Sequence, residues 1–361
     1  MTHAKFKIKP QSGSKTKALA VIGGGMAGVA CARTLMQAGH KVTLFEKSPG
    51  FGGRMATLDS AFGTFDYGTQ YFTVRDARFK RALETVPGLC KAWSANTIRV
   101  LDAQGQVATA SLPTGETHWV AVPGMNALVA RWAQPLQAQT QQQVELQTRV
   151  THLDRDPMNH GQWQLHTEGP GGTQHVFSGF DAVLLAIPAE QSRLLLETAP
   201  QADTLARQID RFDAAPCWTL MLAFPQAMQP GLSALGPQWN AARSTHHRIA
   251  WLARESSKPG RSAVERWTVQ ASAEWSQEHL LDYAELVQAK LLKAFAEVTG
   301  IRAEPAHMQS HRWLFAKTLE PLGKSHLWDA KAGLGVCGDS CLGHRVEDAF
   351  LSGLELALAV A

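Results

Sequence analysis

The chain has 361 residues, of which 45% are hydrophobic and 18% charged, so we expect one or two globular domains with substantial cores. Its net charge of +4 is too small to favour nucleic acid or a membrane surface as a partner. The five cysteines include no Cys-x-x-Cys pair, and no apolar signal segment or span of about 18 apolar residues occurs. We therefore expect a cytoplasmic protein without a metal site; its oligomeric state is left open.

The start of the chain is basic. Residues 1–17 contain five lysines and no acidic residue, and they precede the first apolar run. We predict that this segment is a flexible, solvated tail.

A compact β-α-β unit follows the tail. Residues 18–22 form an apolar strand, residues 26–38 form a helix rich in Ala, Leu and Met, and residues 42–45 form a second strand. Gly39 is a natural end for the helix.

The turn between the first strand and the helix carries a glycine pattern that is typical of dinucleotide binding. Gly23 permits a tight turn, Gly25 lets the backbone approach a pyrophosphate, and Gly28 lets the helix lie close to the sheet. The helix N-terminus offers N–H groups to that pyrophosphate. Glu46, at the end of the second strand, is placed to accept hydrogen bonds from an adenosine ribose.

Two further motifs suggest a longer cofactor than a nicotinamide dinucleotide. Gly52-Gly53-Arg54-Met55 presents a guanidinium that can bind a diphosphate through two parallel N–H donors. Gly338-Asp339 ends an apolar strand near the C-terminus, where Asp339 can bind sugar or ribityl hydroxyls. Arg345 precedes a final helix whose N-terminus can face the N1–C2=O region of a flavin. A flavin dinucleotide held along its length would use all three motifs, so we predict FAD.

The remaining elements alternate in type. We predict helices at 124–133, 276–298 and 347–360, and a Gln-rich linker or exposed turn at 134–143. We predict strands at 120–122, 144–153, 162–167, 175–177, 181–187, 218–223, 249–252, 267–271 and 334–337.

These patterns predict an α/β protein of two domains. A Rossmann-type FAD-binding domain would be assembled from residues 18–75, 140–195 and 326–361. A substrate domain with a mixed, mainly antiparallel sheet would comprise residues 76–139 and 196–325.

The motifs together resemble the flavin-containing amine oxidase superfamily, and within it the renalase-like branch of bacterial type. The resemblance rests on the motifs above and on three further segments: Gly68-Thr69-Gln70-Tyr71-Phe72-Thr73 with Arg75-Asp76, Ser256-Ser257-Lys258-Pro259-Gly260-Arg261, and His311-Arg312-Trp313. It implies a flavin hydroxylase-like fold with noncovalent FAD, and places Gln70 and Tyr71 near the isoalloxazine. The full set of predicted cofactor contacts is Gly23, Gly25, Met26, Ala27, Gly28, Glu46, Lys47, Gly53, Arg54, Met55, Gln70, Tyr71, Val150, Gly338, Asp339, Arg345, Val346, Glu347 and Ala349.

The resemblance also implies an activity. Renalase-like proteins oxidise the 2- and 6-dihydro isomers of NAD(P)H to NAD(P)+, by hydride transfer to flavin N5 with O2 as the final acceptor and hydrogen peroxide as product. We expect Tyr71 and Trp313 to form the wall of the substrate pocket. Oxidation or desaturation of a small amine is the second hypothesis, and a non-catalytic flavin-binding interaction protein is the third. A plain NAD dehydrogenase would not explain the second and third motifs.

The sequence departs from the family pattern at several positions. Thr69 replaces the more usual alanine, and Gln270 falls where relatives carry histidine. No lysine matches the one that many amine oxidases place near flavin N5. Lys258 and Lys317 lie near motifs, and we expect both side chains to be solvated.

Overall fold

The computed structural model describes residues 16–93, 98–109, 116–159, 161–209, 213–228, 237 and 239–361. The chain divides into two compact units. The first consists of Met1–Gly53, Val129–Asp213 and Thr318–Ala361, and the second of Arg54–Leu128 and Ala214–Lys317. The predicted domains differ from these units at residues 54–75, 129–139, 196–213 and 318–325. The cofactor and substrate roles of the two domains stay predictions.

The described part of the first unit is built on a six-stranded sheet in the order β19-β20-β13-β1-β2-β9, in which only β19 runs antiparallel to its neighbour. Its strands are β1 (Ala18–Ile22), β2 (Lys41–Phe45), β9 (Gln143–Glu145), β13 (Ala182–Leu185), β19 (Leu327–Asp329) and β20 (Leu334–Val336). A separate three-stranded antiparallel sheet contains β10 (Arg149–Arg155), β11 (Trp163–Glu168) and β12 (Gln174–Phe180). The parallel sheet confirms the Rossmann-type α/β prediction.

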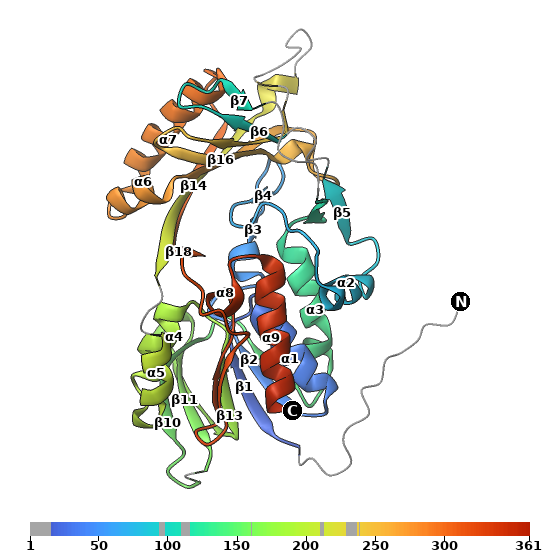
Figure 1. Cartoon of the computed structure of the whole chain (residues 1–361), viewed down its shortest axis with the longest axis vertical. Coiled ribbons are helices and arrows are strands. Elements are labelled where there is room, and N and C mark those ends of the chain that lie inside the picture. The colour runs from blue at the N-terminus through green and yellow to red at the C-terminus, as the bar shows by residue number, and fades with distance from the viewer. Residues whose placement is uncertain are drawn as a thin grey trace, which may run out of the picture. The chain divides into compact units, whose positions relative to one another are not determined.

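Two long helices of the first unit lie side by side, drawn in blue and red in Figure 1. They are α1 (Met26–Gln37) and α9 (Val346–Val360). A Cβ atom at Gly353 would stand 2.1 Å from the carbonyl oxygen of Ala27, so only glycine permits this approach. The other helices are α3 (Asn126–Ala138, which starts in the second unit), α4 (Ala189–Leu196), α5 (Asp203–Ile209) and α8 (Asp339–Leu342).

The Gln-rich stretch predicted as a linker or exposed turn is confirmed only in part, since residues 134–138 are helical and residues 139–142 form a largely exposed turn. Helix α3 continues through Pro135 to Ala138 because Leu136 is buried on its inner face. The chain then forms β9, which pairs with β2 at the edge of the parallel sheet. The predicted strand at 144–153 is accordingly split between β9 and β10 by a turn at Gln147, which has a positive φ of 53°.

The second unit contains a seven-stranded sheet in the order β18-β14-β17-β16-β15-β6-β7. Its strands are β6 (Ile98–Leu101), β7 (Val107–Thr109), β14 (Ala214–Phe224), β15 (Ala241–Ser244), β16 (Ile249–Arg254), β17 (Glu265–Ala271) and β18 (His307–Thr318). Two ribbons pair β3 (Thr57–Leu58) with β4 (Phe65–Asp66) and β5 (Cys90–Trp93) with β8 (His118–Ala121). Among the described pairings of the large sheet, only β15 with β6 is parallel.

Helices cover one face of this sheet. They are α6 (Ala273–Glu278) and α7 (Ala284–Thr299), while α2 (Ala77–Glu84) lies elsewhere in the unit. Leu291 of α7 belongs to the same buried cluster as Leu252 and Val269 of the sheet. The single helix predicted at 276–298 is therefore broken. Apolar residues that fitted its period lie at the break, where Leu281 is 90% exposed.

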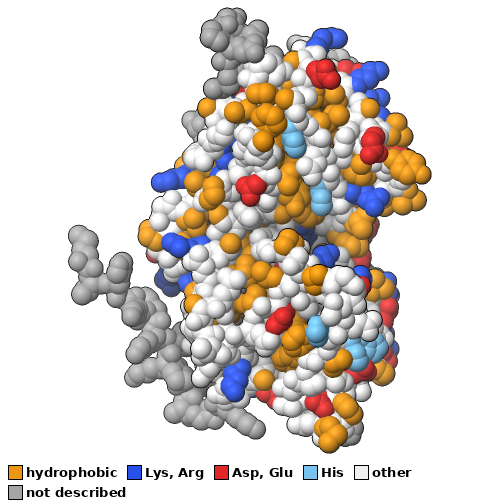
Figure 2. Space-filling view, turned by 180° about the vertical axis from the view of Figure 1, so that it is seen from behind, with side chains coloured by type: hydrophobic (Ala, Val, Ile, Leu, Met, Phe, Trp, Pro, Cys, Tyr) orange, Lys and Arg blue, Asp and Glu red, His pale blue; other side chains and the backbone are white. Residues whose placement is uncertain are grey.

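Most of the predicted basic tail, residues 1–15, lies outside the described residues. Lys17 is held in place, since its N–H donates to His40 Nδ1 (3.2 Å) and its ammonium donates to the carbonyl of Val360 (2.5 Å). No helix in the described part of the chain is both long and apolar enough to cross a membrane. On the face shown in Figure 2, Lys and Arg side chains are scattered among Asp and Glu, consistent with the mild net charge.

Candidate functional site

The turn between β1 and α1 has no room for a side chain at Gly23 or Gly28. A Cβ atom at Gly28 would stand 1.9 Å from the carbonyl oxygen of Gly23, and Gly23 has a φ of +114°. Helix α1 begins at Met26 with Gly25 as its N-cap, without a side-chain cap and without an acidic residue in the first turn. Its first N–H groups and the positive end of its dipole are thus available to an anion.

Glu46 lies beside this turn at the end of β2 and is buried. One carboxylate oxygen accepts a hydrogen bond from the N–H of Gly24 (2.6 Å), and the other accepts from the N–H of Ser48 (2.7 Å). Each oxygen has a second lone pair, so the fixed carboxylate can still accept ribose hydroxyls. Lys47, the next residue, is exposed.

The second glycine motif lies directly on the first. The N–H of Gly52 donates to the carbonyl of Gly24 (3.0 Å), and Gly25 and Gly52 form a β-bridge. A Cβ atom at Gly53 would lie 3.2 Å from the Cα of Gly25. Two segments far apart in sequence therefore form one double glycine turn, and Met55, just after it, is buried.

The C-terminal motif follows β20, at the same carboxyl edge of the sheet as Gly23 and Glu46. Asp339 is buried and accepts a hydrogen bond from the Thr318 hydroxyl (2.7 Å), while the N–H of Gly338 donates to Ser352 (2.8 Å). Ligands of open α/β sheets bind at this edge.

Helix α9 begins at Val346, one residue before the predicted start. The N–H of Arg345 donates to the carboxylate of Asp348 (3.2 Å), which fixes the entry to the helix. Val346 and Glu347 are buried and Ala349 is half-buried. Val150 lies on β10 and packs against a hydrophobic cluster that contains Ile22, so its predicted cofactor contact stays a prediction.

In the second unit, nearly every peptide of the turn at residues 66–70 is fixed by a hydrogen bond. The Gly68 carbonyl accepts from the side-chain amides of Gln270 (2.7 Å) and Gln70 (3.1 Å). The Tyr67 carbonyl accepts from the indole N–H of Trp313 (3.0 Å), and the Thr69 N–H donates to the Arg54 carbonyl (2.8 Å).

Glycine is required at position 68 because a Cβ atom there would stand 2.1 Å from the carbonyl oxygen of Arg54 and 3.2 Å from the Trp313 ring. The structure shows a close approach to Arg54 and Trp313. Gln270 acts here as a clamp on the turn, which is a role that sequence reasoning missed.

Gln70 is buried, and both ends of its amide are engaged within the protein. Its oxygen accepts from the ammonium of Lys258 (3.2 Å), and its NH2 group donates to the carbonyls of Asp66 and Gly68. The side chain therefore shapes the turn, while its contact with the isoalloxazine stays a prediction.

The expectation that Lys258 is solvated is wrong. Its side chain is fully buried, and its ammonium also donates to Asp66 (3.0 Å) and Glu255 (2.9 Å). Arg261, buried as well, donates to the same oxygen of Asp66 (2.7 Å). Burial of any one of these charges alone would be strongly unfavourable, and pairing offsets that cost. Lys317, in contrast, is exposed as expected.

The pKa values of the two acids in this cluster, Asp66 and Glu255, are shifted in opposite directions. Burial tends to raise the pKa of Asp66, but the positive charges of Lys258 and Arg261 outweigh burial and hold it below its usual value. Burial raises the pKa of Glu255, and Lys258 offsets only part of that increase. The sequence feature that could have revealed this buried charge cluster is the spacing of Glu255, Lys258 and Arg261 at every third residue.

The two predicted wall residues belong to different aromatic groups. Tyr71 packs on His118, with ring centroids 4.0 Å apart, and on Trp251 at 5.8 Å. Trp313 stacks on Tyr67 at 5.3 Å and 19°.

A histidine completes each aromatic group. His311 meets Trp313 edge-on at 4.4 Å. Burial is the main reason that the pKa of His118 and that of His311 are lowered, so both imidazoles are neutral near pH 7. Sequence reasoning missed His118, Trp251 and Tyr67 because only contacts between distant segments reveal them.

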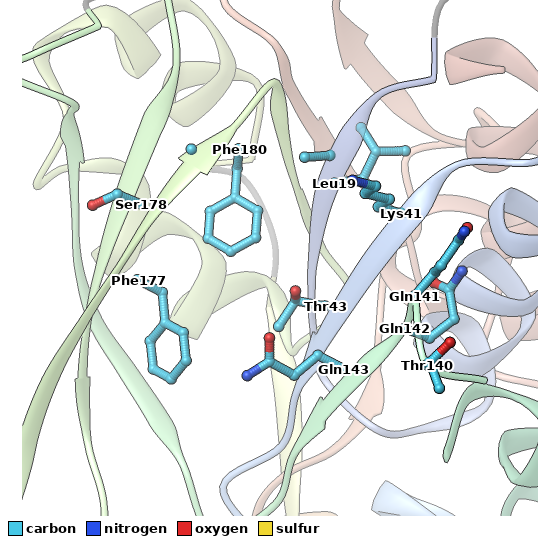
Figure 3. Close-up of a pocket in the computed structure, with 12 residues that line it drawn as sticks. Leu19, Lys41, Thr43, Thr140, Gln141, Gln142, Gln143, Phe177, Ser178 and Phe180 are labelled. Atoms are coloured by element: carbon cyan, nitrogen blue, oxygen red, sulfur yellow. The ribbon is translucent and has the colours of Figure 1, made fainter. Parts of the chain in front are cut away.

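A pocket of about 280 Å³ lies elsewhere in the first unit (Figure 3). Leu19, Lys41 and Thr43 line it from β1 and β2, together with residues 140–143 and 177–180. It lies near the amino ends of β1 and β2, and none of the predicted site residues lines it. In the part of the chain that is described, no group of three or more His, Cys, Asp and Glu side chains could hold a metal ion.

Comparison with family models gives two matches. Residues 21–85 match the NAD(P)-binding Rossmann-like domain, and residues 109–361 match the flavin containing amine oxidoreductase model. The chain belongs to the flavin-containing amine oxidoreductase family. This membership, together with the Rossmann match, confirms the predictions of an oxidoreductase and of FAD as its cofactor.

The similarity of the chain to curated proteins is local. A carotenoid phi-ring synthase of Streptomyces griseus is 38% identical over 68 residues, which cover 16% of this chain and 13% of the relative. A 4,4'-diapophytoene desaturase of Staphylococcus haemolyticus is 43% identical over 58 residues, which cover 16% of this chain and 12% of the relative. The chain thus matches only a small part of the length of these relatives.

Solved structures share the fold over nearly the whole chain. A putative protoporphyrinogen oxidase from Exiguobacterium sp. 255-15 superimposes with a TM-score of 0.74 at 16% identity, covering 96% of this chain and 99% of that one. Cyclohexylamine oxidase from Brevibacterium oxydans superimposes with a TM-score of 0.71 at 12% identity, and the coverage of both chains is the same. At these identities the likeness concerns the fold alone.

Proposed function

We propose that this family member oxidises misreduced isomers of NAD(P)H, the 2- and 6-dihydro forms, to NAD(P)+ in the cytoplasm. The dihydropyridine loses a hydride, and O2 gains that hydride and a proton to give hydrogen peroxide. FAD, when bound, supplies the two-electron acceptor at its N5 atom. The proposal keeps the renalase-like assignment, which the family match leaves open.

The residues of the first unit fit the adenosine diphosphate part of FAD. The double turn of Gly23–Gly28 and Gly52–Gly53 leaves backbone N–H groups uncovered by side chains, which suits a pyrophosphate. Glu46 would bind the ribose hydroxyls. Asp339, at the same sheet edge, would bind a hydroxyl-bearing part of the cofactor.

The observation that carries the substrate proposal is the pair of aromatic groups that adjoin the fixed turn at residues 66–70. Tyr71 with Trp251, and Trp313 with Tyr67, present flat surfaces suited to a planar ring. Hydride transfer depends on orientation and exclusion of water more than on a general base. Neutral His118 and His311 agree with such a role because neither adds a charge.

Amine oxidation is the second candidate. It is favoured by the description of the matching family model, and aromatic surfaces of the kind formed by Tyr67 and Trp313 also attract cationic amines.

One experiment separates the two reactions. The anaerobic visible spectrum of the FAD-loaded protein is followed after addition of chemically over-reduced NAD, pure 4-dihydro NADH, or a set of simple amines. We expect rapid bleaching of the flavin bands with the over-reduced mixture alone. Bleaching by amines would replace the proposal with amine oxidation. Bleaching by none of these compounds would favour a non-catalytic flavin protein.

A further inference from the structure

The large sheet of the second unit aligns three side chains across neighbouring strands. Arg243 of β15 lies directly opposite Trp251 of β16, and Trp251 lies opposite Gln270 of β17. Directly opposed residues point to the same face of a sheet. Arg243, Trp251 and Gln270 therefore form one row on one face.

This row points away from the helices. The next row, Ala242, Leu252 and Val269, belongs to the buried cluster that includes Leu291 of α7. Because side chains alternate along each strand, the row of Arg243 is on the opposite face. Gln270 reaches the Gly68 carbonyl and Trp251 packs on Tyr71, so this face carries the fixed turn and the Tyr71 aromatic group.

Arg243 brings an uncompensated positive charge to this face. Its side chain is exposed, and it makes no hydrogen bond or ion pair with another described residue. Glu116 acts to raise the pKa of His118, and its carboxylate is held by two hydrogen bonds from Arg75. After burial and Glu116, the charge of Arg243 is the next influence on the pKa of His118, which it lowers.

We propose that Arg243 binds an anionic phosphate group of a dinucleotide substrate, while Trp251 and Tyr71 contact its rings. The inference rests on the proposed function and deepens it by assigning the residue that recognises the charge of the substrate. A guanidinium matches phosphate oxygens through paired N–H donors. The same charge disfavours a protonated amine, so Arg243 also acts against the competing class of substrate.

The test uses FAD-saturated protein and the unreactive dinucleotide NAD+, with binding measured by titration calorimetry. We expect Arg243→Gln to weaken binding about 10- to 100-fold, as for loss of a charged hydrogen bond, and Arg243→Lys to restore part of it. Arg302→Gln removes an exposed arginine of the same unit and should leave binding unchanged. Unchanged binding in Arg243→Gln, or no NAD+ binding by the natural protein, would overturn the inference.

A kinetic arm separates charge recognition from a general loss of structure. Anaerobic flavin reduction is compared for dihydro isomers of NADH and for uncharged N-benzyl dihydronicotinamide isomers. We expect Arg243→Gln to raise the half-saturating concentration of the dinucleotide alone, with the reduction rate at saturation and the uncharged probe unaffected. Equal weakening of both probes would contradict a phosphate contact.

The two arms also distinguish failure of the inference from failure of the proposed function. Binding of NAD+ that depends on Arg243, without flavin reduction by any dihydropyridine, would remove the proposed reaction and keep the anion site. Reduction by the dihydro isomers that is insensitive to Arg243→Gln would keep the reaction and remove the site.

Discussion

The buried ammonium of Lys258 holds several side chains around the turn at residues 66–70 in place. Its ammonium joins Asp66, Glu255 and the amide oxygen of Gln70, all within hydrogen-bond distance. Gln70 in turn holds the carbonyl of Gly68. The lysine therefore fixes which end of the Gln70 amide faces the turn, and a buried ion pair here sets the conformation of a candidate site.

Replacing this lysine tests its structural role. We expect Lys258→Met to lower the free energy of unfolding by about 3–5 kcal/mol, because buried Glu255 would lose its ammonium partner and Asp66 would keep only Arg261. Urea unfolding at pH 7 measures the effect. Lys317→Met, at an exposed lysine, should change stability by less than about 0.5 kcal/mol. Similar stability of the two variants would show that the buried network contributes little.

At the scale of elements, the first β-α-β unit was predictable and the later elements less so. Strand β1, helix α1 and strand β2 lie where their periodicity and Gly39 placed them. The segment predicted as one helix at 276–298 failed because period alone does not say which apolar residues find a buried surface. Leu281 and Tyr283 fit the period yet are exposed at the break between α6 and α7.

The close packing of α1 against the turn that precedes it can be tested by a substitution at Gly28. We expect Gly28→Ala to reduce the FAD retained by the purified protein at least about tenfold, because the new methyl group would meet the Gly23 carbonyl at 1.9 Å and displace the helix N-terminus. The absorbance ratio of flavin to protein measures retention. Gly50→Ala is the matched control, since a Cβ atom there would meet nothing within 4 Å. Normal flavin content in Gly28→Ala would contradict the predicted pyrophosphate site.

At the scale of the whole molecule, a cofactor bound by the folded state should stabilise it. We expect FAD at 1,000 times its dissociation constant to add about 4 kcal/mol to the unfolding free energy of the stripped protein. Thermal unfolding with increasing FAD measures this shift, and Gly28→Ala should show little of it. A transition temperature that does not depend on FAD in the natural protein would argue against tight noncovalent binding.

The sequence alone determined the α/β class, the glycine turns, the carboxylate of Glu46 and the start of the last helix, because these depend on local backbone conformation and on short-range order along the chain. Only the tertiary structure decided that Lys258 is buried, that Gln270 clamps Gly68, and that Arg243 shares a face with Trp251. Those facts depend on which distant segments meet and in what strand register. A shift of one residue in register would turn the Arg243 side chain to the other face of the sheet.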